Sequence, residues 1–192
     1  EVFSRLAPPP LPPGDPALAV EFFGLSDSAK RVVFVCDRSL STADRLDRVK
    51  QELKRSLAAL KPEQQFAVLF TARNRTLDIT TRNLLPVNDK AKARAEKFVD
   101  QMATDPETDL EPALRRALLL RPEVIYVLTE REVDQKVVDA AEELNHDGPA
   151  IRIHGLQFLR PSESTQLRAL AGLNGGQFRL VSEKDLESPS PA

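Results

Sequence analysis

One carboxylate and two hydroxyls follow the first long apolar run of the sequence at alternating positions. Residues 31–37 read RVVFVCD, and Ser39 and Ser41 come two and four positions after Asp37. A loop that leaves a strand can aim three such oxygens at one point. Oxygen ligands that are partly neutral suit a hard divalent cation such as Mg²⁺, Mn²⁺ or Ca²⁺. The spacing therefore indicates a candidate metal site just after a strand.

Alternating apolar patterns predict the elements that must position these side chains. Short runs rich in apolar residues predict strands at residues 31–37, 66–71, 76–80, 124–129, 151–158 and 177–181. The connection before 76–80 is too short for a crossover helix, so this strand is expected to pair antiparallel at an edge. Apolar residues at steps of three and four predict helices at about 42–61, 91–102, 110–120, 133–144 and 167–171.

Strand–helix alternation of this kind predicts the fold class. We expect an α/β fold with a doubly wound, Rossmann-like, mostly parallel six-stranded sheet and one antiparallel edge strand. Ligands of such sheets bind outside the carboxyl ends of the strands. Asp37 follows the first strand of this sheet, so it lies where that rule predicts a ligand-binding site.

The two ends of the chain differ in composition from the middle. Six of the 15 prolines lie between Pro8 and Pro16, and proline fixes φ and lacks an amide donor. We expect residues 1–18 to form a Pro-rich linker, residues 19–187 a single domain and residues 188–192 a disordered tail. A ligand segment for a proline-binding module is the alternative reading of the linker.

Charge and cysteine content exclude several classes of protein. The chain has 27 Lys and Arg against 29 Asp and Glu, a net charge of −2. A nucleic-acid-binding domain would show a basic excess, so no nucleic acid partner is expected. One cysteine excludes an intramolecular disulfide framework and a cysteine-rich metal site.

The beginning of the predicted domain resembles that of a von Willebrand factor type A (VWA) domain, in the segment Phe22-Phe23-Gly24 and in the run RVVFVCDRSLS. It is most similar to bacterial members in which the domain follows a Pro-rich linker. The family's metal-ion-dependent adhesion site combines D-x-S-x-S, a Thr before a later helix and an Asp after a later strand. The resemblance covers about residues 20–186, in matching order of elements.

The resemblance assigns five metal ligands in this chain. Asp37, Ser39 and Ser41 match the first part of the motif, and Thr108 matches the second. Where the family has T-D-G, this chain has T-E-R, so Glu130 stands in place of the Asp.

Three departures from the family pattern affect the expected cation. Leu40 replaces a small residue between the two serines. Glu130 is one methylene longer than Asp, so its carboxylate reaches about 1.5 Å further. Arg131 replaces the Gly of the family pattern, and its charge or that of Arg38 would lower the affinity for a cation if it pointed at the site.

The resemblance implies a protein-interaction module for adhesion or scaffolding. Its cofactor would be Mg²⁺, or Mn²⁺ or Ca²⁺, and its partner a protein that presents an acidic residue to the cation. The linker would tether the domain to a larger protein or to a membrane anchor. A membrane-anchored or extracytoplasmic location agrees with the resemblance and the Pro-rich start of the chain.

Two alternatives remain open at this point. The first is a degenerate VWA structural domain without metal, in which Ser41 caps a helix and Thr108 with Glu111 forms a capping box. The second is a small hydrolase or phosphotransfer protein. Hydrolytic catalysis by a Ser or Cys nucleophile uses a histidine beside it as the general base. Neither His146 nor His154 falls near the predicted strand-end site. We expect no catalytic residues and no enzymatic activity.

Overall fold

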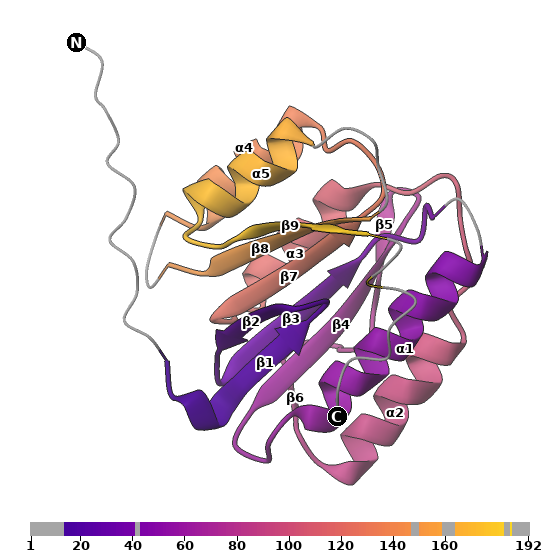
Figure 1. Ribbon diagram of the computed structural model, residues 1–192, viewed down its shortest axis with the longest axis vertical. Helices are drawn as coiled ribbons and strands as arrows, with labels where there is room; N and C mark the ends of the chain where they lie inside the picture. The colour runs from indigo at the N-terminus through magenta and orange to yellow at the C-terminus, as the bar shows by residue number, and fades with distance from the viewer. Residues whose placement is uncertain (1–13, 41–42, 147–149, 159–163, 183–184, 186–192) are drawn as a thin grey trace.

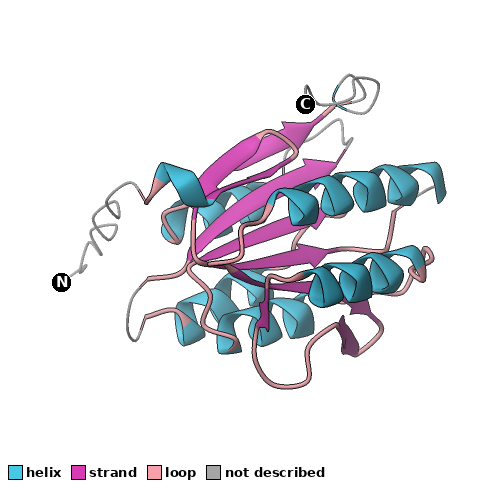
Figure 2. Cartoon of the chain, turned by 90° about the horizontal axis from the view of Figure 1, so that it is seen from below, coloured by secondary structure: helices cyan, strands magenta, loops and turns pink. Residues whose placement is uncertain are grey.

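The computed structural model describes residues 14–40, 43–146, 150–158, 164–182 and 185. In this part of the chain, helices cover both faces of a central sheet (Figure 1 and Figure 2). The sheet consists of β3 (Arg31–Cys36), β4 (Gln65–Ala72), β5 (Arg75–Asp78), β6 (Leu85–Pro86), β7 (Val124–Thr129), β8 (Arg152–Phe158) and β9 (Phe178–Val181). The helices are α1 (Ala43–Ala59), α2 (Asp89–Asp100), α3 (Leu110–Leu119), α4 (Gln135–Leu144) and α5 (Thr165–Leu173).

The order of the strands confirms the predicted fold class. It runs β5-β4-β3-β7-β8-β9, and the five strands from β4 to β9 in this order are parallel. β5 pairs antiparallel with β4 at the edge, as predicted. The two-residue strand β6, also antiparallel to β4, was not predicted, because two residues are too few to show a pattern. β3 lies in the middle, so its carboxyl end is flanked by those of β4 and β7.

The packing of the helices explains the continuous apolar runs. All six residues of β7 are buried, because helices lie against both faces of the sheet. α1 and α2 pack together on one face, where the rings of Phe70 in β4 and Phe98 in α2 are 5.9 Å apart. α3, α4 and α5 pack on the other face, and a Cβ at Gly155 of β8 would lie 2.9 Å from Leu167 of α5.

Every helix among the described residues is too short or too polar to traverse a lipid bilayer.

A small hairpin that was not predicted precedes the main sheet. Strands β1 (Ala19–Phe22) and β2 (Leu25–Ser28) pair antiparallel, and β1 packs against α1. Phe23 and Gly24 form the turn with φ of 44° and 73°, and two positive φ angles are what a type I′ hairpin turn requires. The ring of Phe23 packs edge-on against Phe158, which holds the hairpin on the sheet.

The described part of the predicted linker includes a short element that joins the folded unit. Pro16–Leu18 forms a 3-10 helix (η1), and the Leu18 side chain is buried. Residues 1–13 of the predicted linker and the predicted tail at 188–192 lie outside the described residues.

Candidate functional site

Asp37 is a buried carboxylate at the carboxyl end of β3. The whole residue is only 3% exposed to solvent. Its backbone N–H donates to the carbonyl oxygen of Leu128 in β7 at 2.8 Å. A buried charge is costly unless other groups hydrogen bond to it. The fold must therefore supply hydrogen-bond donors around this carboxylate.

Within the part of the chain that the structure describes, five hydrogen bonds converge on the two oxygens of Asp37. Oδ1 accepts from the Ser39 N–H at 3.0 Å and from the hydroxyls of Thr71 and Thr108, each at 2.7 Å. Oδ2 accepts from the hydroxyl of Ser39 at 2.6 Å and from that of Thr129 at 2.8 Å. Burial alone would raise the pKa of Asp37, but the bonds from Ser39, Thr108 and Thr71 hold that pKa below its ordinary value. The carboxylate is therefore charged at neutral pH.

The donors come from four separate segments of the chain. Ser39 follows β3, Thr71 belongs to β4 and Thr129 is the last residue of β7. Thr108 precedes α3, and the N-cap of that helix is Asp109, whose carboxylate accepts from the Glu111 N–H at 3.1 Å. Because Asp109 performs the capping, the Thr108 hydroxyl is directed at Asp37 instead.

Thr71 and Thr129 were not identified from the sequence. Each lies at or next to the end of an apolar run, in FAVLFT and VIYVLT, and each is almost completely buried. A hydroxyl at the carboxyl end of a buried strand was the available signal, since β4 and β7 flank β3.

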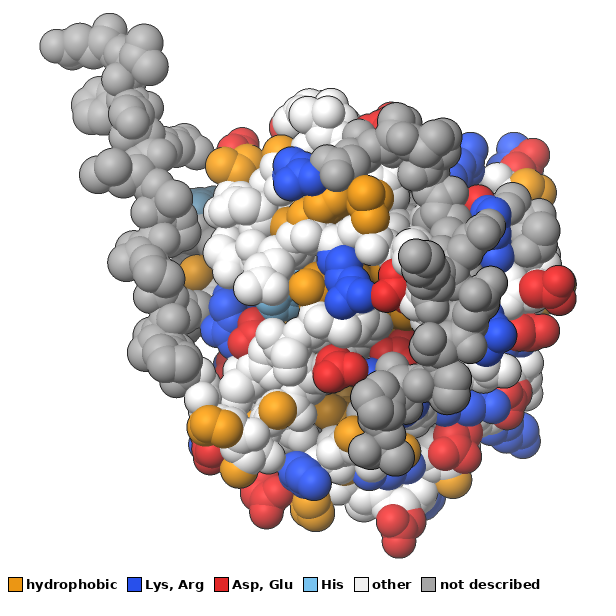
Figure 3. Space-filling model, in the orientation of Figure 1, with side chains coloured by type: hydrophobic (Ala, Val, Ile, Leu, Met, Phe, Trp, Pro, Cys, Tyr) orange, Lys and Arg blue, Asp and Glu red, His pale blue; other side chains and the backbone are white. Residues whose placement is uncertain are grey.

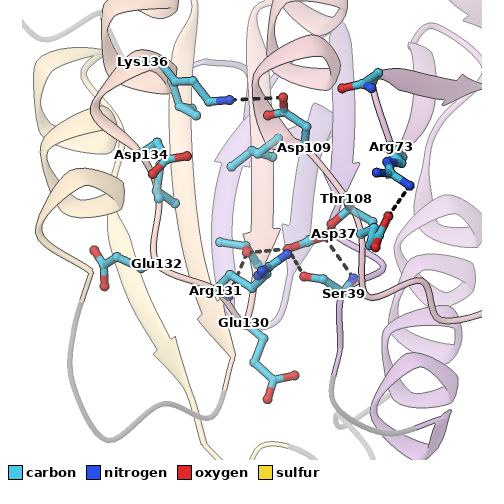
Figure 4. A pocket seen from close by; sticks show the side chains of 16 residues that line it. Asp37, Ser39, Arg73, Thr108, Asp109, Glu130, Arg131, Glu132, Asp134 and Lys136 are labelled. Atoms are coloured by element: carbon cyan, nitrogen blue, oxygen red, sulfur yellow. Dashed lines mark hydrogen bonds and ion pairs between the residues drawn. The ribbon is translucent and has the colours of Figure 1, made fainter.

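The structure brings together three of the five predicted ligands. Asp37, Ser39 and Thr108 converge, whereas Ser41 lies outside the described residues. The Glu130 carboxylate forms an ion pair with Arg45 of α1. Figure 4 shows the Glu130 side chain directed away from the other three.

The two flanking arginines have partners of their own. The Arg38 guanidinium donates to the carbonyl oxygens of Thr71 and Ala103, each at 2.8 Å, and to Asp105 at 3.0 Å, so it turns away from Asp37. The Arg131 guanidinium donates to the carbonyl oxygen of Pro106 at 3.1 Å.

Leu40 is 4% exposed and belongs to the core. Burial therefore explains why a large apolar residue stands at this position in the loop.

A pocket of about 780 Å³ opens over Asp37, with Ser39, Thr108 and Thr129 in its wall (Figure 4). Lys136 pairs with Asp109 at 3.1 Å across one side of it, and Arg73 pairs with Glu107 on another. The described residues of its wall include six carboxylates and three basic side chains, a formal balance of −3: Asp37, Glu107, Asp109, Glu130, Glu132 and Asp134 against Arg73, Arg131 and Lys136. The pocket is therefore acidic.

Other metal sites are not evident in the described part of the chain. Among these residues, no group of three or more His, Cys, Asp and Glu side chains is placed to hold a metal. Basic and acidic side chains are interspersed over the described atoms of the face in Figure 3. The candidate site thus depends on one buried carboxylate and neighbouring hydroxyls.

The two histidines and the cysteine make contacts within the fold and do not line the pocket. His154 is buried, its Nε2 lies 2.8 Å from Oδ2 of Asp27, and its Nδ1 accepts from the Gln177 N–H at 3.0 Å. His146 Nδ1 lies 3.1 Å from the carbonyl oxygen of Glu142 near the end of α4. Burial raises the pKa of Cys36, and that thiol is part of the core.

Comparison with solved structures identifies the fold. A structure described as von Willebrand factor type A from Catenulispora acidiphila matches with a TM-score of 0.70 and 18% identity, covering 84% of this chain and 42% of that one. The chain has the von Willebrand factor type A fold. At this identity the match establishes the fold alone, and it agrees with the resemblance seen in the sequence. No family model and no curated protein matches the chain.

Two further solved structures are similar in fold to this chain. Proximal thread matrix protein 1 from the mussel byssus matches with a TM-score of 0.64 and 18% identity, covering 82% of this chain and 43% of that one. The N-terminal domain of TFIIH p34 matches with a TM-score of 0.54 and 13% identity, covering 78% and 89%. The chain spans less than half the length of the Catenulispora acidiphila and mussel structures.

Proposed function

We propose that this VWA domain is a protein-interaction module whose partner binds at the carboxyl edge of the sheet, through a divalent cation held over Asp37. One observation carries the proposal: the hydroxyls of Ser39 and Thr108, from two separate segments, converge on a single buried carboxylate that borders a pocket. Ser41 and Glu130 remain proposed ligands of the same cation.

The hydrogen bonding of the hydroxyls supports a cation at this place. A hydroxyl has one proton and two lone pairs. Ser39 and Thr108 each direct the proton at Asp37, so their lone pairs stay available to a hard cation, which prefers oxygen ligands. Mg²⁺ retains water ligands readily, and when bound it would supply a position that a carboxylate from outside can occupy.

The charge of the pocket defines what the partner requires. An acidic residue of a partner would meet a wall with a formal balance of −3, which repels it in the absence of a cation. Partner binding through an acidic residue should therefore require the metal. We propose in addition that residues 1–18 tether the domain to a larger protein or to a membrane anchor.

A second candidate is a structural domain of the same fold without metal. It is supported by the ion pair that holds Glu130 on Arg45 and by the five hydrogen bonds that already satisfy Asp37. The position of the two histidines and the cysteine outside the pocket favours either candidate over a hydrolase or phosphotransfer enzyme.

A Mn²⁺ titration followed by calorimetry tests the proposal with two matched variants. Thr71→Val and Thr108→Val each remove one 2.7 Å hydrogen bond to the same oxygen of Asp37. Thr108 lines the pocket, whereas Thr71 is fully buried in β4. We expect Thr108→Val to weaken Mn²⁺ binding by at least about tenfold, equivalent to about 1.4 kcal/mol, and Thr71→Val to change it by less than about threefold.

Three outcomes separate the candidates. The expected contrast between the two variants supports direct ligation by the hydroxyl of Thr108. An equal loss in both variants would show that only the placement of Asp37 matters, which contradicts ligation by Thr108. Absence of Mn²⁺ binding at millimolar concentration in the unmodified chain would favour the structural domain without metal.

A further inference from the structure

The ion pair between Arg45 and Glu130 connects two elements beside the candidate cation site. Glu130 directly follows β7, and Arg45 lies in the first turn of α1. The Glu130 side chain is 14% exposed and the Arg45 side chain 25%, so water only partly screens their charges. Ion pairs of this kind are stronger than fully exposed ones.

The same carboxylate is the acid that the cation site would need. Asp37, Ser39 and Thr108 already converge, but Glu130 points away from them (Figure 4). To approach a cation over Asp37, Glu130 must leave Arg45. The two contacts therefore compete for one side chain.

We propose that Arg45 is a positioning residue that withholds Glu130 from the cation, so that metal binding and the Arg45–Glu130 ion pair exclude each other. This inference rests on the proposed function. The other two arginines near the site do not perform this role, because Arg38 is held by Thr71, Ala103 and Asp105. Arg131 is bonded to the carbonyl oxygen of Pro106.

The competition couples the cation site to α1. When Glu130 leaves Arg45, the first turn of α1 loses its ion pair to the end of β7. Because coupling between two equilibria is reciprocal, any partner that draws Arg45 away would also raise the affinity for metal. The pair thus gives the domain a means of regulating its own cation site.

Arg45→Gln is the central variant, with Mn²⁺ affinity as the measurement. Loss of the guanidinium should break the contact of Glu130 with α1 and tighten Mn²⁺ binding about tenfold. Arg48→Gln is the matched control, because it removes the same charge from the next turn of α1, where Arg48 bonds only weakly to Gln51 at 3.3 Å. It should change the affinity by less than about twofold.

The double variant Arg45→Gln/Glu130→Gln separates release of Glu130 from a general effect of charge. If the gain arises because Glu130 reaches the cation, adding Glu130→Gln abolishes it. A double variant that keeps the full tenfold gain would overturn the inference, since removal of a nearby positive charge would then suffice. An unchanged affinity in Arg45→Gln would overturn it as well.

A measurement of stability tests the pair without reference to metal affinity. In EDTA, a double-mutant cycle on Arg45 and Glu130 should show the two residues coupled, with about a three- to tenfold effect on the unfolding equilibrium. Saturating Mn²⁺ should abolish that coupling, and persistence of the coupling would contradict mutual exclusion. If the contrast between Thr71→Val and Thr108→Val is observed but Arg45→Gln has no effect, only this inference fails. If no variant binds Mn²⁺, both fail.

Discussion

Thr129 donates its hydroxyl proton to Oδ2 of Asp37 at 2.8 Å, across the carboxyl ends of two neighbouring parallel strands. The Thr129 oxygen in turn accepts from the backbone N–H of Arg131 at 3.0 Å. On the other side, the Thr71 oxygen accepts from the backbone N–H of Arg38 at the same distance while it donates to Oδ1 of Asp37. Both threonines therefore tie the turn after a strand to the buried carboxylate, which is held in place from both flanking strands.

Asp37→Asn should destabilise the fold even without metal. An amide replaces one accepting oxygen by a donor, so two or three of the five surrounding donors would lose their acceptor inside the protein. We expect the free energy of unfolding to fall by about 2–4 kcal/mol, measured by urea denaturation in EDTA. Asp134→Asn, at an exposed position of the same pocket, is the control and should cost less than about 0.5 kcal/mol. Equal effects of the two substitutions would refute this account of Asp37.

Two glycines near the end of α5 should respond to alanine in opposite directions. A Cβ at Gly176 would lie 1.9 Å from the carbonyl oxygen of Ile153, and this neighbour is backbone that cannot rotate away. Gly176→Ala should therefore cost about 3 kcal/mol or more. Gly172 belongs to α5 and a Cβ there would meet nothing within 4 Å, so Gly172→Ala should stabilise by about 0.5–1 kcal/mol. Thermal denaturation of the two variants tests this, and the same sign in both would contradict it.

Acid should destabilise the protein through Asp27, which joins the β1–β2 hairpin to β8. Burial alone would raise the pKa of Asp27, but hydrogen bonds from His154, Arg152 and the Ser28 N–H lower it from 3.8 to about 2. A carboxyl group whose pKa is lower in the folded state contributes stability above its unfolded pKa. That contribution is lost as pH falls from about 4 to about 2 and amounts to about 2 kcal/mol.

Comparison with Asp27→Asn isolates this effect, because other carboxylates titrate in the same range. The difference in unfolding free energy between the unmodified chain and the variant should shrink by about 2 kcal/mol between pH 5 and pH 2. A difference that stays constant with pH would show that the charge of Asp27 contributes nothing specific to the folded state.

The sheet and its helices were predictable because burial on both faces of a strand, or on one face of a helix, requires a regular pattern of apolar residues in the sequence. Strands such as β3 and β7 read as unbroken apolar runs, and α1 repeats buried residues at steps of three and four. The β1–β2 hairpin was missed, because its strands are four residues long and mix exposed with buried positions. Its turn is formed by Phe23 at positive φ, which is unusual for a bulky residue and is sustained by packing of the ring.

The site divides in the same way between local sequence and tertiary structure. Asp37 and Ser39 are two residues apart, so chain geometry alone brings them together. Thr71, Thr108 and Thr129 are 34, 71 and 92 residues from Asp37, and only the parallel pairing of β4, β3 and β7 aligns the strand ends that carry two of them. The direction of Glu130 was also decided by the fold. Charges attract according to their distance in space, and the α1 helix places the Arg45 guanidinium within reach of this carboxylate.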